Sequence, residues 1–251
     1  MEPDLAPNAA FAIVLLVIAF ASAVKGALGF GFPLIAVPIS ANFIGVRTTV
    51  VLIAVSVVFS NFFVLLRGGG RLEDARRFGG LLASVIVGTV IGAFLLDRLD
   101  PATLALIVGI TTLLFATLGL LNIAPEISAR AQAYTGPTVG LASGVMGGTT
   151  GIFAPLIAAY MHSLRLGKRT FVFWLTVAFF VGGVTQTLSY YRLGLYTTTM
   201  LWYAVATFIP VIAGTQVGFW VQDRLPTETF RRLILLLVLA SGLNLVVRQL
   251  I

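Results

Sequence analysis

Hydrophobic residues gather into eight long runs along this chain, and short polar gaps with most of the charged residues separate the runs. A helix that crosses a lipid bilayer needs roughly 20 apolar residues. Most of the runs have about this length, so each of these predicts one membrane-spanning helix. The runs are 9–44, 48–66, 78–96, 102–121, 134–161, 171–188, 198–221 and 233–247.

The first and the fifth runs are too long for a single helix, and glycine and proline interrupt both. The interruption of the first run lies between Lys25 and Pro33, and that of the fifth lies between Gly147 and Pro155. Clustered glycines together with a proline disfavour a continuous helix. Each of these two runs therefore predicts a helix, an unwound stretch and a second helix.

The chain also contains an internal repeat. A shift of 122 positions places the sequence 33–36 on the identical sequence 155–158, and a shift of 126 places 97–99 on 223–225. A repeat period of this length indicates duplicated halves rather than a solenoid. We therefore expect one integral membrane domain built from two repeats, 1–126 and 127–251, with about four helices in each.

The basic residues indicate how the two halves are oriented. If each interrupted run crosses the membrane once, the basic residues between runs divide eight to seven between the two faces. If each interrupted run is a hairpin that returns to its starting side, they divide eleven to four, as the positive-inside rule expects. We therefore predict an inverted repeat with both termini outside the cytoplasm. The four residues on the less basic face are Arg47, Arg98, Arg192 and Arg248.

Composition agrees with an all-α, polytopic membrane protein. Hydrophobic residues make up 59% of the chain and charged residues 10%, whereas soluble domains carry about 25% charged residues. We interpret the net charge of +7 as a determinant of membrane orientation and expect no nucleic-acid partner. The acidic start of the sequence does not resemble a cleaved signal peptide, so none is expected.

Residue types also limit the chemistry. The chain has no cysteine and one histidine, His162, which excludes disulfides, thiolate metal sites and bis-histidine haem ligation within it. All nine carboxylates lie at the termini or between the runs, which argues against an intramembrane aspartyl protease or a carboxylate-bound metal. We therefore expect no enzymatic activity, no metal and no cofactor.

The two interruptions are the candidate binding site. Unwound backbone at membrane depth is tolerated only where protein or a water-filled cavity satisfies its polar groups, and a matched pair in inverted halves is typical of a secondary transporter. Pro33 and Pro155 suit the start of the returning helices, whose free amides and positive dipole ends favour an anion. Lys25 is the basic residue that lies well inside an apolar run. The candidate residues are Lys25, Gly26, Gly29, Phe30, Gly31, Pro33, Leu34, Asn61, Gly147, Gly148, Thr149, Thr150, Gly151, Phe153, Pro155 and Gln186.

Structural alternatives exist for several of these residues. Lys25 could extend its side chain to the membrane interface and need no ligand. Asn61 and Gln186 could form hydrogen bonds between helices, and the glycines could allow close helix packing. We assign the packing role to six glycines inside uninterrupted runs: Gly88, Gly92, Gly109, Gly119, Gly214 and Gly218.

The segment 25–34 with Pro38, and the segment 143–155, resemble the paired signatures of the TauE/SafE sulfite exporter family, also called the 4-toluene sulfonate uptake permeases. The resemblance implies a multi-pass transporter of the bacterial inner membrane that exports small sulfur-containing anions such as sulfite, sulfoacetate or other organosulfonates. Its partners would be the anion, the lipid bilayer and a coupling ion, H+ or Na+, and a homodimer is left open. Phe30, Phe32 and Ala154 depart from the glycines common in the family, which affects the size of the pocket. A passive anion channel and a membrane scaffold without substrate are the alternatives.

Overall fold

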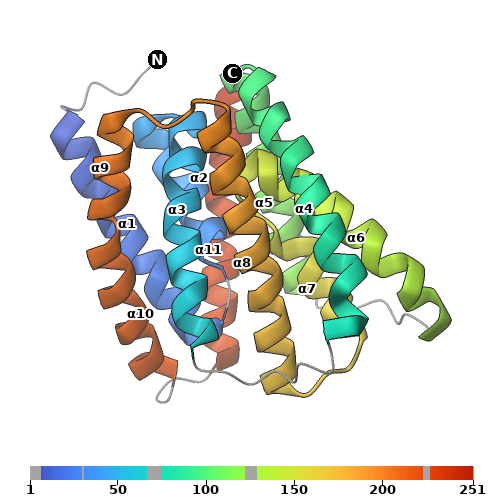
Figure 1. Cartoon of the computed structure of the whole chain (residues 1–251). Coiled ribbons are helices and arrows are strands. Elements are labelled where there is room, and N and C mark those ends of the chain that lie inside the picture. Colours follow the sequence, from blue (N-terminus) through green and yellow to red (C-terminus); the bar gives the residue numbers. More distant parts are fainter. Residues whose placement is uncertain (1–6, 30, 67–74, 122–128, 223–226, 251) are drawn as a thin grey trace.

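The computed structural model describes residues 7–29, 31–66, 75–121, 129–222 and 227–250, which form helices joined by short connections without a strand (Figure 1). Six helices in these ranges are long and apolar enough to cross a membrane. The prediction of an all-α polytopic membrane protein is confirmed. The helices are α1 Pro7–Leu28, α2 Phe32–Ile44, α3 Val46–Leu65, α4 Ala75–Arg98, α5 Pro101–Leu121, α6 Ala129–Thr150, α7 Ala154–Ser163, α8 Lys168–Arg192, α9 Thr198–Ala206, α10 Phe208–Gln222 and α11 Thr227–Leu250.

Both interrupted runs are broken helices, as predicted. The first hairpin consists of α1 and α2, and the second hairpin consists of α6 and α7. Gly29 and Gly31 in the first turn have φ values of 84° and 103°, and Gly151 in the second turn has a φ of 78°. Side chains other than glycine rarely adopt such angles. Gly29 and Gly151 therefore end the first helix of each hairpin, and Gly31 lies at the N-cap of α2. Pro33 and Pro155 are each the second residue of the returning helix.

The two hairpins enter the bundle from opposite ends (Figure 1). At the upper end in that view, Asn244 of α11 donates a hydrogen bond of 3.0 Å to Asn42 near the end of α2. At the lower end, Gly136 of α6 lies beside the hydroxyl of Tyr160 in α7. In the first hairpin α1 begins and α2 ends at the upper end, whereas in the second α6 begins and α7 ends at the lower end (Figure 1).

Glycines hold the first helix of each hairpin against a helix of the other half. A Cβ atom at Gly92 of α4 would lie 2.2 Å from the carbonyl oxygen of Val145 in α6. A Cβ atom at Gly218 of α10 would lie 2.1 Å from the carbonyl oxygen of Ala23 in α1. Such close backbone approach requires small residues. The packing role predicted for glycines in uninterrupted runs is confirmed, with contacts at Gly88, Gly92, Gly109, Gly119, Gly214 and Gly218.

The turns of the two hairpins pack on corresponding positions of α3 and α8. A Cβ atom at Gly29 would lie 3.8 Å from the side chain of Val172 in α8, and one at Gly151 would lie 3.8 Å from that of Val50 in α3. The shift of 122 positions relates Gly29 to Gly151 and also Val50 to Val172. The correspondence of the complete halves, 1–126 and 127–251, stays a prediction.

The run 198–221 is one candidate membrane span, as expected, but its helix is interrupted. The run forms α9 and α10, which meet at Thr207. Pro210 lacks the amide that would bond to the carbonyl of Ala206, so the regular helix is interrupted there. The Thr207 hydroxyl donates to the carbonyl of Ala204 at 2.6 Å and lies 2.8 Å from the Ser56 hydroxyl of α3.

Candidate functional site

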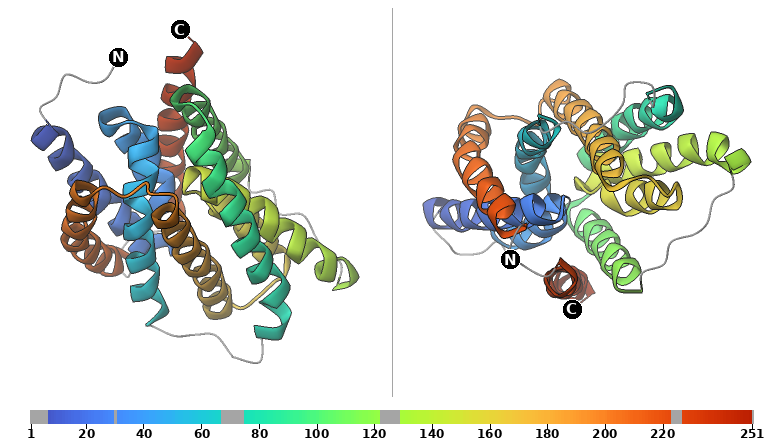
Figure 2. Two further views of the ribbon diagram at one scale, coloured as in Figure 1. Left: turned by 45° about the horizontal axis from the view of Figure 1, so that its top comes forward. Right: turned by 90° about the horizontal axis from the view of Figure 1, so that it is seen from below.

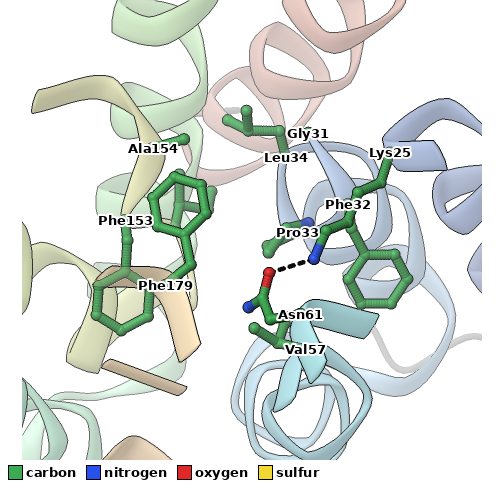
Figure 3. A pocket seen from close by; sticks show the side chains of 11 residues that line it. Lys25, Gly31, Phe32, Pro33, Leu34, Val57, Asn61, Phe153, Ala154 and Phe179 are labelled. Carbon is green, nitrogen blue, oxygen red and sulfur yellow. Dashed lines mark hydrogen bonds between the residues drawn. The ribbon is translucent and has the colours of Figure 1, made fainter. Parts of the chain in front are cut away.

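A small cavity lies between the two hairpin turns in the interior of the bundle (Figure 3). The space open to the centres of water-sized spheres is about 20 Å³, which is room for about one water molecule. Both hairpins contribute to its wall, together with α3 and α8. The residues of the wall are Lys25, Gly31, Phe32, Pro33, Leu34, Val57, Asn61, Ile152, Phe153, Ala154 and Phe179.

Lys25 gives the cavity its charge. The side chain is 3% exposed, and its ammonium group donates a hydrogen bond to the Oδ1 atom of Asn61 (Figure 3). The Nδ2 atom of Asn61 is buried without a hydrogen-bond partner among the described residues. No carboxylate belongs to the cavity wall within the ranges that the structure describes.

This arrangement favours an anionic ligand. A buried charge without a partner costs several kcal/mol, as an order of magnitude, and buried charges in proteins are normally paired. Lys25 has further N–H donors beyond the one it gives to Asn61, and the free Nδ2 of Asn61 adds another beside it. The burial of Lys25 inside the bundle also differs from the interfacial position that snorkelling would produce.

Two helix N-termini also point at the cavity. No side chain caps the N-terminus of α2 or that of α7. The first amides of a helix have no partner within it, and their dipoles give that end a partial positive charge. Because Phe32 of α2 and Ala154 of α7 line the cavity from opposite hairpins, both positive ends lie at its wall. Oxyanions are bound at helix N-termini of this kind.

Opposite Lys25 the wall is apolar, with the rings of Phe153 and Phe179 facing it (Figure 3). The Phe153 ring fills the space beside two glycines. A Cβ atom at Gly147 would lie 2.2 Å from this ring, and one at Gly182 would lie 2.7 Å from it. The Phe153 carbonyl accepts a hydrogen bond of 2.6 Å from the hydroxyl of Ser143 in α6.

Gln186 lies at the second hairpin but does not line the cavity. Its Nε2 atom donates to the carbonyl of Gly147 at 2.9 Å and to the hydroxyl of Tyr190 at 2.7 Å. The Tyr190 hydroxyl donates in turn to the carbonyl of Gly148 at 2.6 Å. These bonds satisfy carbonyl groups in the last turn of α6, so Gln186 supports the broken helix, as the interhelical alternative describes.

Thr149 and Thr150 likewise lie away from the cavity wall. The Thr149 hydroxyl lies 3.1 Å from the carbonyl of Gly92 and 2.9 Å from that of Val145. The Thr150 hydroxyl donates to the carbonyl of Met146 at 2.7 Å. A threonine in a helix readily bonds to the carbonyl four residues earlier. The Thr150 hydroxyl also accepts a hydrogen bond of 3.1 Å from the amide of Ile152, so both hydroxyls are engaged with the backbone.

The remaining candidates divide between the cavity, the turns and helix packing. Gly26 packs against α10 and Gly148 against α4, so close contact explains both. Gly29, Gly151 and Pro155 shape the turns without lining the cavity, and Phe30 lies outside the described residues. The candidates in the wall are Lys25, Gly31, Pro33, Leu34, Asn61 and Phe153.

Sequence reasoning missed three residues of the wall: Val57, Ile152 and Phe179. The family resemblance already placed Phe32 and Ala154 at the pocket, although neither was among the candidate site residues. Helical spacing contains a signal for Val57 and Phe179. Val57 precedes Asn61 by four residues, and Phe179 precedes Gln186 by seven, so each shares a helix face with a candidate residue.

The fold and the site together define an integral membrane protein with two broken helices around a buried cation, the architecture of a membrane transporter. The family model for the sulfite exporter TauE/SafE matches residues 14–245, nearly the whole chain, and the chain belongs to this family. The family is one of membrane transporters of sulfur-containing anions, so the resemblance of the two glycine-rich segments is confirmed. No curated protein and no solved structure matches the chain.

Proposed function

We propose that this protein is a secondary transporter that exports sulfite or small organosulfonates across the bacterial inner membrane, with both termini in the periplasm. The observation that carries the proposal is Lys25, a buried lysine without an acidic partner in the described wall of a cavity that the N-termini of α2 and α7 also line. In the proposed complex, the oxygen atoms of the anion accept hydrogen bonds from Lys25, from Asn61 Nδ2 and from the first amides of α2.

Charge pairing also explains how the anion would cross the bilayer. A lone charge at the centre of a membrane is costly, whereas a lysine paired with an anion forms a nearly neutral unit. The hairpins enter from opposite ends of the bundle, so a tilt of one relative to the other would open the cavity to alternate sides. At about 20 Å³ the cavity is too small for sulfite, so its wall must move apart to admit the anion.

The wall favours anions that carry an apolar group. Phe153 and Phe179 face the cationic side across the cavity, and both rings must move apart to admit a ligand (Figure 3). An organosulfonate would place its charged oxygens at Lys25 and its carbon atoms against these rings. Lys25 is the ionisable group of the described wall, so coupling to H+ would use Lys25 or the anion itself.

Substitution of Lys25 tests the proposal. Sulfite and a short alkyl sulfonate should raise the Tm of the purified wild-type protein, and Lys25→Met should lower the affinity about 10- to 100-fold, because a charged hydrogen bond contributes about 1.5–3 kcal/mol. The unliganded Lys25→Met protein should be at least as stable as the wild type, since an uncompensated buried charge is removed. Unchanged affinity would overturn the proposal.

A control and a flux measurement complete this test. Arg192→Gln removes an exposed charge at the end of α8, away from the cavity, and should leave the ligand-induced shift intact. In proteoliposomes, flux that saturates and shows counterflow would support a carrier. Conductance that does not saturate would indicate a channel instead.

A further inference from the structure

An open groove is lined by residues of α2 and α11 near the ends of both helices. These helix ends lie at the upper end of the bundle (Figure 1). Its space is about 500 Å³ on the measure that gives about 20 Å³ for the cavity. Arg248, Asn244, Asn42 and Ser241 supply its polar groups. No acidic side chain lines this groove in the part of the chain that the structure describes.

The groove has donors to offer an anion. One N–H of Asn244 donates to Asn42, whose own amide donates to the carbonyl of Pro38 at 2.8 Å. The Ser241 hydroxyl donates to the carbonyl of Leu237 at 2.9 Å. The guanidinium of Arg248 and the second N–H of Asn244 are therefore the donors that would bind an anion in the groove. A guanidinium binds oxyanions through two parallel hydrogen bonds.

A closed apolar seam borders the cavity and lies between it and the groove in the order of residues along α2 and α11. Gly31 and Leu34 line both the cavity and the seam, where they face Leu235 and Val238 of α11. The seam is about 10 Å³ on the same measure and is shut by these side chains. At 1.5 Å per residue, the eight residues from Leu34 to Asn42 place the groove about 12 Å from the cavity along α2.

The position of α11 allows the seam to open without unfolding the site. Figure 2 shows α11 at the edge of the bundle beside α5. None of the residues of the cavity wall belongs to α11. A movement of α11 away from α2 would therefore join groove and cavity while Lys25 and Asn61 keep their positions.

We propose that this groove is an outer anion subsite of the transport path, in which Arg248 and Asn244 hold a sulfite or sulfonate before or after its passage through the seam. This inference rests on the proposed function. The groove lies at the end that carries Arg47, Arg98, Arg192 and Arg248, the less basic end, which the positive-inside rule places outside the cytoplasm. A fixed cation at the mouth of a path raises the local concentration of anions.

Thiol labelling tests the groove without any transport measurement. The chain has no cysteine, so Ser241→Cys introduces a unique thiol. We measure the rate with a sulfonate-bearing methanethiosulfonate reagent divided by the rate with a trimethylammonium analogue of similar size. This ratio should be at least fivefold higher at Ser241→Cys than at Leu243→Cys, the control on an exposed part of α11 outside the groove. Adding Arg248→Gln should abolish this preference.

A transport arm tests the role of the groove in the path. For uptake from the outer side, Arg248→Gln should raise KM at least fivefold, while the ligand-induced shift of Tm at the Lys25 site stays as in wild type. An unchanged KM, or a charge preference that persists in Arg248→Gln, would overturn the inference. If a short-chain phosphatidylglycerol protects Ser241→Cys and sulfonates do not, the groove holds lipid headgroups and the inference is likewise overturned. If ligands cause no Lys25-dependent shift of Tm, the proposed function is overturned. The labelling ratio does not depend on that shift, so the two failures can be told apart.

Discussion

The two hairpins share one scaffold and differ in chemistry. Each has a glycine at positive φ where its first helix ends and a proline as the second residue of its returning helix. Each turn also packs on a valine of the other half, through the matched contacts of Gly29 with Val172 and of Gly151 with Val50. The backbone geometry that breaks a helix inside the bundle is therefore present twice.

The difference lies at one matched position. The shift of 122 places Lys25 on Gly147. In the first hairpin, the side-chain amide of Asn61 in α3 accepts a hydrogen bond from Lys25, and its Nδ2 group has no partner among the described residues. In the second hairpin, an amide from α8, that of Gln186, meets the Gly147 carbonyl, and the Phe153 ring fills the space beside that glycine. One hairpin thus presents charge to the cavity, and the other closes it with apolar surface and internal hydrogen bonds.

Alanine substitutions at the packing glycines Gly92 and Gly218 should lower stability more than any other change considered. They test whether the helix packing is equivalent in both halves. Gly92→Ala and Gly218→Ala each place a Cβ atom about as close to a carbonyl oxygen, at 2.2 Å and 2.1 Å. The helix backbones must separate, so each variant should lose more than about 3 kcal/mol of stability. Thermal unfolding in detergent measures both effects.

Gly79→Ala is the matched control for these variants. A Cβ atom at Gly79 of α4 meets no atom within 4 Å. Alanine should leave Tm unchanged or raise it there, because it favours a helix over glycine by about 1 kcal/mol. If Gly92→Ala destabilises the protein and Gly218→Ala does not, the two halves are not equivalent scaffolds.

Conversion of the Asn61 and Gln186 side-chain amides to acids should change the stability of the protein in opposite directions. Asn61→Asp gives Lys25 a carboxylate partner, so it should raise the Tm of the unliganded protein and abolish the shift caused by sulfite. Gln186→Glu buries a carboxylate that cannot donate to the Gly147 carbonyl, so it should cost about 3 kcal/mol. Tm values of both variants with and without sulfite provide the measurement.

The opposite signs of the two Tm changes are what makes this prediction specific. Both substitutions exchange an amide for an acid of nearly the same shape at a fully buried position. Packing therefore cannot explain opposite outcomes, and the charge of the neighbouring hairpin can. Destabilisation of both variants, together with a retained sulfite shift in Asn61→Asp, would contradict the assignment of the anion site to the first hairpin.

The sequence was informative wherever a signal is local. Glycine and proline predicted both helix breaks, and the charge of Lys25 inside an apolar run predicted its role as a candidate. The spacing of small residues four apart, as at Gly88 and Gly92 or Gly214 and Gly218, likewise predicted close packing.

Other parts of the site depend on how helices cross, which no local signal contains. The sequence could not tell that Gln186 and Thr149 face backbone carbonyls, because this depends on which helix lies opposite them. The same limit applies to Gly26 and Gly148, which sit in glycine-rich breaks but act in packing. The kink at Thr207 did have a local signal in Pro210, three residues later.

Tyr190→Phe should give the smallest effect and tests whether the second hairpin only supports the site. The substitution deletes the hydroxyl that donates to the Gly148 carbonyl and accepts from Gln186. Loss of a buried hydrogen bond should lower stability by about 1 kcal/mol, measured by thermal unfolding. The affinity for sulfite should stay within about twofold of wild type, because Tyr190 does not line the cavity. A tenfold weaker affinity at an unchanged Tm would show instead that the second hairpin takes part in holding the anion.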